Sequence, residues 1–304
     1  MEDDKEDKTR LQEGSPPNEA IFFVLAYLPL FELLAMARVC KSLRDAINND
    51  ILPWLKLIVG PPLNWRLSDE ILTKITSKAE GRLRVLALIN CVKITDDGLL
   101  RVVAQNPHIS KLLVPGCTSL TPEGIIKAVK LISQNNHRLK SLQINGVYGI
   151  RKQDLETLST LIDQTHLHTP MTLLYHKYKS LSTLQLIKSD EPIDVDACPK
   201  CNQIGIVYDC PQNLCQRKWH KQVRECKGCE NCIIRCVECG VCISSMQGHE
   251  EALCSDILCL NCWLRLPKCN FCNKPYCKRH GDERAISVSG SSGFLCDACH
   301  FDFD

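Results

Sequence analysis

Cysteine pairs dominate the second part of this sequence. Of its 21 Cys, 18 lie between Cys198 and Cys299, and they include six non-overlapping pairs with the spacing C-x-x-C. Cys277 and His280 repeat this spacing with an imidazole as the second group. A C-x-x-C turn can place both sulfur atoms on one tetrahedral ion, so the pattern indicates structural zinc. The predicted ligands are Cys198, Cys201, Cys210, Cys215, His220, Cys226, Cys229, Cys232, Cys236, Cys239, Cys242, Cys259, Cys262, Cys269, Cys272, Cys277, His280, Cys296 and Cys299.

The start of the chain bears on whether these thiols stay reduced. It opens with acidic residues, and its first apolar run, Ala20 to Phe31, is short and contains Pro29. A signal peptide needs a basic start, and a membrane span needs about 20 apolar residues. We therefore expect a cytoplasmic or nuclear protein with no membrane partner. In such a compartment dense Cys pairs are metal ligands and not disulfides.

The ligand supply sets the expected number of ions. The 18 Cys together with His220, His249, His280 and His300 give 22 candidate ligands, enough for four or five zinc ions. Apolar residues are scattered in this region, so zinc would supply folding energy, about 10–16 kcal/mol per site in small fingers. A redox-active dithiol needs one exposed, activated pair and does not explain so many.

An iron–sulfur cluster is the competing cofactor. The run Cys226, Cys229, Cys232 and Cys236 matches the bacterial ferredoxin spacing, although Val237 replaces the Pro that normally follows. Because Cys239 and Cys242 continue the run, overlapping zinc pairs suit it equally well. We expect zinc and not iron–sulfur.

Two ways of pairing the last ligands remain open. A cross-braced arrangement would join Cys259 and Cys262 to Cys277 and His280, and would leave a second site for Cys269, Cys272, Cys296 and Cys299. A sequential arrangement would join neighbouring pairs instead. The outline is similar to a RING or FYVE domain, but a RING usually places its His in the second pair. Direct RING-type ligase activity is therefore the alternative function.

Charge argues against nucleic acid as the partner. The whole chain has 37 Lys and Arg and 35 Asp and Glu, a net charge of +2. Residues 190–304 hold 13 basic and 16 acidic residues, a net charge of −3. Zinc sites with four thiolates add further negative charge, which opposes phosphate contact. We expect a protein-binding module.

Residues 16–60 are predicted to form three short helices that cannot bury all their apolar surface alone. The segment resembles an F-box: Pro17 and Glu19 open the pattern, and Leu28-Pro29 and Val39-Cys40-Lys41 continue it, with Trp54 near its end. Leu43 stands where the family usually has Trp. The resemblance implies binding to a Skp-family adaptor and, through it, to a cullin. The expected partner-binding residues are Pro17, Ile21, Leu25, Leu28, Pro29, Leu30, Leu34 and Val39.

A repeat occupies the middle of the chain. Segments beginning at Leu83, Ile109 and Leu139 each follow L-x-x-L-x-L, then a turn, then the start of a helix, at spacings of 26 and 30 residues. This pattern is typical of leucine-rich repeats, and Leu67 to Leu72 fits the helical half of an earlier repeat. By alternation, the outward strand positions are Val85, Ala87, Lys111, Leu113, Ser141 and Gln143, a candidate substrate surface.

The expected fold is therefore α+β and multi-domain. We predict a disordered tail (1–15), an F-box (16–60), a short α/β leucine-rich repeat solenoid (61–188), a linker (189–197) and an irregular zinc-stabilised domain (198–304). The order resembles plant F-box proteins of the Skp-interacting class with a Cys-rich tail. It implies the substrate-receptor subunit of a Skp–cullin–F-box ubiquitin ligase, non-catalytic by itself, with a protein substrate.

Overall fold

The structure is a computed structural model. It describes residues 19–134, 139–162, 173–182, 185, 187, 191–212, 215, 226–243, 248–284, 286–287 and 294–301. The predicted tail, Pro17 and His220 lie outside these residues. No helix among the described residues is both long enough and apolar enough to cross a membrane.

Short helices form the N-terminal part. They are α1 (Glu19–Leu25), α2 (Leu30–Met36), α3 (Lys41–Asn49) and the 3-10 turn η1 (Leu52–Trp54). Pro29 stands at the start of α2, where its missing N–H has no helical partner to lose. Leu25, Leu33, Leu43 and Ile47 are buried, and the Trp54 indole nitrogen donates to the Ile47 carbonyl oxygen at 2.8 Å. The predicted helical N-terminal part is confirmed.

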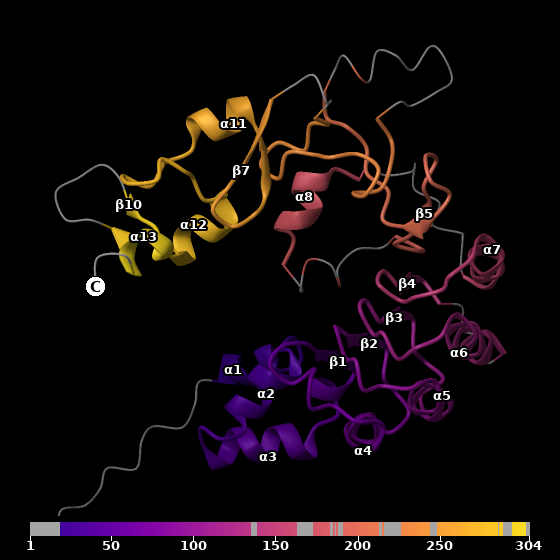
Figure 1. The fold of residues 1–304 in the computed structure, drawn as a ribbon. Coiled ribbons are helices and arrows are strands. Elements are labelled where there is room, and N and C mark those ends of the chain that lie inside the picture. The colour runs from indigo at the N-terminus through magenta and orange to yellow at the C-terminus, as the bar shows by residue number, and fades with distance from the viewer. Residues whose placement is uncertain are drawn as a thin grey trace, which may run out of the picture.

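A parallel sheet follows, with its strands in chain order (Figure 1). The strands are β1 (Lys56–Val59), β2 (Val85–Leu88), β3 (Lys111–Leu113) and β4 (Ser141–Gln143). Each is followed by helical structure: α4 (Asp69–Thr76), η2 (Ser77–Ala79), α5 (Asp96–Gln105), α6 (Pro122–Gln134) and α7 (Lys152–Leu161). Leu57, Leu86, Leu112 and Leu142 pair in register across the sheet and form one buried row.

The opposite face of the sheet differs from the sequence-based expectation. Val85, Ala87 and Leu113 were expected to face outward, but they are buried in a small cluster with Ile58 and Ile187. Ser141 and Gln143 are buried as well, and the Lys111 ammonium donates to the Ile187 carbonyl oxygen at 3.3 Å. The expectation that these strand positions form an outward surface is wrong, because five of the six are buried and Ile187 packs against three of them.

The segment expected to be a linker lies along the edge of the sheet. The Leu142 N–H donates to the Pro192 carbonyl oxygen at 2.8 Å, and Ile193 forms a parallel bridge with Leu142. The Asp194 carboxylate accepts hydrogen bonds from the N–H groups of Ile144 and Asn145, at 2.8 and 3.2 Å. This segment therefore extends the sheet beyond β4.

The Cys-rich part consists of short elements. These are β5 (Asp196–Ala197), β6 (Ile204–Gly205), β7 (His249–Glu251), β8 (Ile257–Cys259), α11 (Leu260–Arg265), α12 (Lys278–Arg284), β9 (Ile286–Ser287), β10 (Phe294–Leu295) and α13 (Asp297–Phe301). Its two small cores each contain Cys side chains: Cys236 lies with Ala252, Leu258 and Leu266 in one, and Cys269 and Cys296 lie with two aromatic rings in the other. Clusters this small bury little apolar surface, so the hydrophobic effect alone stabilises this part weakly.

One helix that precedes the edge segment (191–195) in the sequence packs on the Cys-rich part. In α8 (Tyr175–Ser180), the rings of Tyr175 and Tyr178 contact the ring of Tyr208, with centroids 5.2 and 5.7 Å apart. Lys179 forms a 3.0 Å ion pair with Glu230. Figure 1 shows α8 among the orange segments of the Cys-rich part, although its sequence precedes them.

Candidate functional sites

Four groups of four Cys side chains come together in the Cys-rich part. Within each group the sulfur atoms all lie within 4.8 Å of one another. A tetrahedral zinc ion with Zn–S bonds of about 2.3 Å would separate its sulfur ligands by about 3.8 Å. The groups are Cys198, Cys201, Cys229 and Cys232; Cys210, Cys215, Cys226 and Cys242; Cys236, Cys239, Cys259 and Cys262; and Cys269, Cys272, Cys296 and Cys299.

The sulfur–sulfur distances fit such an ion. Cys210 and Cys242 are 3.6 Å apart, Cys239 and Cys259 3.7 Å, and Cys272 and Cys296 3.9 Å. All of these cysteines are free thiols and none forms a disulfide. The donor set of four sulfurs is the one that structural zinc sites use.

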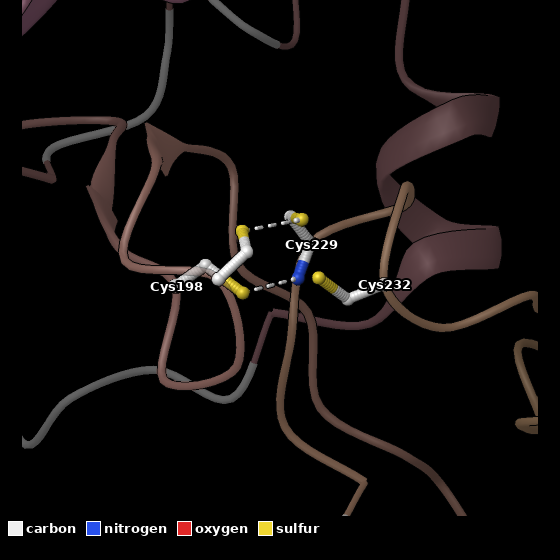
Figure 2. Close-up of side chains that lie close together, drawn as sticks. Cys198, Cys229 and Cys232 are labelled. Atoms are coloured by element: carbon white, nitrogen blue, oxygen red, sulfur yellow. Dashed lines mark hydrogen bonds between the residues drawn. The ribbon is translucent and has the colours of Figure 1, made fainter.

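Figure 2 shows Cys198, Cys229 and Cys232 of the first group, with their sulfur atoms directed toward a common centre. The Cys229 N–H donates to the Cys198 sulfur at 3.3 Å. Cys198 follows β5 and precedes β6, so the hairpin carries one pair, while the chain after residue 225 carries the other.

A shared turn shapes three of the C-x-x-C pairs. The residue directly after the second Cys adopts a left-handed conformation: Asn202 has φ 58°, Gly240 has φ 74° and Asn273 has φ 54°. Gly and Asn tolerate this region better than other residues. The turn lets the N–H of Asn202, Gly240 and Asn273 donate to the carbonyl oxygen of Cys198, Cys236 and Cys269, at 2.8, 2.8 and 3.0 Å.

Two groups combine this turn with the start of a helix. Cys259 precedes the first residue of α11 and Cys262 lies within that helix, opposite the turn of Cys236 and Cys239. Cys296 and Cys299 stand in the same relation to α13, opposite the turn of Cys269 and Cys272. Unpaired N–H groups at a helix start favour nearby anionic sulfur.

In three groups the surroundings of the first Cys favour the thiolate. Burial raises the pKa of Cys198, but N–H donors from Cys229, Lys200 and Cys201 outweigh it and lower the pKa to about 6. Cys269 shows the same balance, and its pKa is also lowered to about 6. The neighbouring Cys239 thiol lowers the pKa of Cys236 to about 4. A deprotonated sulfur is the form that binds a metal.

A buried arginine adds positive charge to the second group. The side chain of Arg235 is only 3% exposed. Its guanidinium donates to the carbonyl oxygens of Tyr208 and Cys226. Four thiolates around a divalent ion carry two net negative charges, so a buried cation beside Cys226 stabilises that group electrostatically.

The structure distinguishes between the predicted pairings. Cys269, Cys272, Cys296 and Cys299 form one group, as the cross-braced arrangement expected. Cys259 and Cys262, at the junction of β8 and α11, do not group with Cys277 and His280. They group with Cys236 and Cys239 instead. The ferredoxin-like run is divided among three groups, so Cys226, Cys229, Cys232 and Cys236 cannot hold one iron–sulfur cluster in this fold.

Cys277 directly precedes α12, and His280 lies in the first turn of that helix. The Cys277 sulfur is 3.2 Å from the His280 Nδ1, and Cys254 and Asp256 lie beside them. Asp256 was not predicted, and Cys254 was counted only in the total supply of candidate ligands. Neither belongs to a C-x-x-C pair, so spacing along the chain gave no signal for them.

The predicted partner-binding side chains of the N-terminal helices separate into two sets. Leu25 and Leu30 are buried, so they stabilise the helical unit and present no surface, and Ile21 and Leu28 pack partly against the same core. Leu34 and Val39 are exposed. The structure adds exposed apolar side chains that the prediction omitted: Phe23, Val24, Tyr27, Phe31 and Leu52.

Two family profiles match separate regions of the chain. The profile of the F-box domain matches residues 17–55, which confirms the resemblance seen in the helical segment. A second profile, described as the At3g27290 F-box protein C-terminal domain, matches residues 194–271. This second match spans the first three Cys groups.

Curated relatives from Arabidopsis thaliana align over most of the chain. F-box protein SKIP28 is 42% identical over 97% of this chain and 95% of its own length. F-box protein SKIP14 is 35% identical over 84% of this chain, but only 56% of its own length. F-box protein At3g27290 is 33% identical over 81% of this chain and 65% of its own length.

Proposed function

Because this chain belongs to the F-box proteins, we propose that it is the substrate-receptor subunit of a Skp–cullin–F-box ubiquitin ligase. The names of SKIP28 and SKIP14 mark those relatives as Skp-interacting partners. The chain itself would supply recognition, and the ubiquitin-transfer chemistry would belong to the other subunits of the complex. In this proposal it acts in the cytoplasm or nucleus.

The observation that carries this proposal is the exposed apolar surface of the N-terminal helices. Phe23 is 77% exposed, Tyr27 67% and Val39 69%. Large apolar side chains gathered on one small unit favour a protein partner, because their exposure to water is otherwise unfavourable. A Skp-family adaptor is the partner we propose for this surface, and the cullin is reached through it.

Substrate binding is better assigned to the Cys-rich part than to the sheet. Three of the strand residues expected to bind a substrate, Val85, Ala87 and Leu113, are buried in a cluster with Ile187. By contrast, Leu260, Leu264 and Phe271 of the Cys-rich part are exposed, at 49%, 60% and 60%. We therefore place a protein substrate on the surface around α11.

Zinc is the metal we propose for the four all-cysteine groups. Each offers four sulfurs at tetrahedral distances, and closed four-sulfur sites are structural and not catalytic. The ions would supply the folding free energy that the small cores lack. Direct RING-type activity is the alternative function, because the group Cys236, Cys239, Cys259 and Cys262 alternates along the chain with the group Cys254, Asp256, Cys277 and His280, as in a cross-braced domain.

We also propose the domain division: an F-box over 16–60, leucine-rich repeats over 61–188 and a zinc domain over 198–304. Four parallel strands in chain order, each followed by helical structure, support the repeat assignment. β1, at the end of the F-box region, pairs with β2 at one edge of the sheet. Residues 191–195 pair with β4 at the opposite edge. These contacts join the three parts.

Binding to a Skp-family adaptor tests the proposed partner surface, using exposed residues whose replacement leaves the buried core of the helical unit intact. Leu34→Ser with Val39→Ser removes two exposed apolar side chains of the helical unit, and we expect at least about tenfold weaker binding to a purified Skp-family adaptor. Ile71→Ser is the matched control, because Ile71 is a similarly exposed apolar residue on α4. Calorimetry should show normal binding for the control. Unchanged affinity in the double variant would contradict the proposed surface.

A further inference from the structure

Four side chains that can bind a metal converge between the β7–β8 turn and α12. One oxygen of Asp256 lies 3.1 Å from the Cys277 sulfur, 3.3 Å from the Cys254 sulfur and 3.3 Å from the His280 Nδ1. All four donor atoms fall within 4.8 Å of one another. Two of the residues come from a hairpin turn and two from a helix start more than 20 residues later.

These distances suit a shared ion. A tetrahedral zinc ion would separate an oxygen and a nitrogen ligand by about 3.3 Å and an oxygen and a sulfur ligand by about 3.5 Å. The observed separations fall within a few tenths of an ångström of those values. Hydrogen bonding alone would require two thiols and an imidazole to share one carboxylate oxygen, and a common ion explains the convergence more simply.

We propose that Cys254, Asp256, Cys277 and His280 form a fifth zinc site, with Asp256 as a carboxylate ligand, and that its ion is released before those of the four all-cysteine groups. Zinc in proteins accepts Cys, His and Asp ligands. Thiolates are soft donors that favour zinc, whereas carboxylate oxygen is a harder donor better suited to magnesium or calcium. A site with two thiolates and a carboxylate therefore holds zinc less tightly than one with four thiolates.

The charge around this site is also balanced differently. Zinc with two thiolates, one carboxylate and a neutral imidazole carries one net negative charge. The Arg279 guanidinium lies 3.9 Å from the Asp256 carboxylate and would neutralise it. Arg279 also donates to the Lys179 carbonyl oxygen of α8, at 3.2 Å. The ion would thus tie α12 to the β7–β8 hairpin beside a contact with α8.

Native mass spectrometry of the full-length zinc-loaded protein, during graded addition of EDTA, tests this site. We expect five ions in the wild type, with one lost at a lower EDTA concentration than the other four. Asp256→Ala should bind that ion more than about 100-fold more weakly, because even loss of an outer-shell partner costs 10–100-fold. It should therefore show four ions and no early loss. Glu250→Ala, an exposed acid on the same hairpin, should match the wild type.

Asp256→Cys separates loss of the ligand from loss of the fold. It converts the site to three thiolates and an imidazole, so the fifth ion should be retained and released with the others. Five ions with unchanged early loss in Asp256→Ala, or simultaneous release of all five ions from the wild type, would overturn the proposal. This inference rests on the proposal that the four all-cysteine groups hold zinc. Fewer than four zinc ions in the wild type would show that this earlier proposal fails. Adaptor binding plays no part in this readout.

Discussion

At the residue scale, Asp194 is an unusual carboxyl group. Burial raises its pKa to about 6, although the N–H donors of Ile144 and Asn145 act in the opposite direction. An unfolded Asp has a pKa of about 3.9. Between these values the folded protein binds more protons than the unfolded chain, so this group makes folding less favourable as the pH rises from about 4 to 6, and the loss is constant above that range.

Asp194→Asn tests this directly. Asn keeps one carbonyl oxygen for the N–H groups but does not ionise. The free energy of unfolding of the wild type relative to Asp194→Asn should fall by about 2 kcal/mol between pH 4.5 and pH 7.5. Urea denaturation of both proteins at the two pH values measures it, and contributions from other titrating groups cancel in the difference. If the difference in free energy of unfolding between the two proteins does not change with pH, the raised pKa of Asp194 is contradicted.

The sequence indicated most of the side chains that the structure brings into these groups, but it did not indicate how they are grouped. The C-x-x-C spacing marks Cys198 and Cys201 as neighbours because the turn between them is local. Nothing in the spacing says that Cys229 and Cys232 complete their group, because that contact depends on the tertiary fold. Asp256 carried no signal, since single acids are common on surfaces.

At the element scale, the helices beside the sheet are joined by a repeated carboxylate contact. Asp69 of α4 accepts hydrogen bonds from the N–H and hydroxyl of Thr95, at 3.0 and 2.6 Å, and Thr95 is the N-cap of α5. Asp96 makes the same pair of contacts with Thr121, at 2.9 and 2.6 Å. A side chain at Gly98 would place its Cβ in steric overlap with the Asp69 carboxylate.

Gly98→Ala should therefore destabilise the protein despite the better helix propensity of Ala. Ala normally stabilises a helix by about 1 kcal/mol relative to Gly. Here the Asp69 side chain must move and lose hydrogen bonds to Thr95, so we expect a net loss of about 1–2 kcal/mol in urea denaturation. In an Asp69→Ala background the same substitution should be neutral or stabilising. Equal cost in both backgrounds would show that Asp69 is not the reason.

The helices and strands were predictable where their patterns are local. Thr95-Asp96-Asp97-Gly98 begins a helix in both sequence and structure, because the cap and acidic first turn act within four residues. The cover over the sheet was not predictable. It depends on contacts such as that of Lys111 with Ile187, which are 76 residues apart and follow no repeat.

At the scale of the whole molecule, the order of parts in the sequence differs from their order in space. α8 precedes the edge segment 191–195 in the chain but packs on Tyr208 of the Cys-rich part, while the edge segment packs on β4. The exposed apolar residues that remain lie mainly on the N-terminal helices and around α11. This distribution suits a receptor that binds an adaptor at one end and a substrate at the other.

Ubiquitin chain formation by the purified full-length protein tests this account most directly. With only the activating and conjugating enzymes present, we predict no chains, because the proposed receptor depends on the other subunits of the complex for ubiquitin transfer. Adding a Skp-family adaptor and its cullin complex should produce ubiquitination of the receptor itself, and Leu34→Ser with Val39→Ser should reduce it. Chains formed without the adaptor and the cullin would contradict the account and identify the chain as a ligase in its own right.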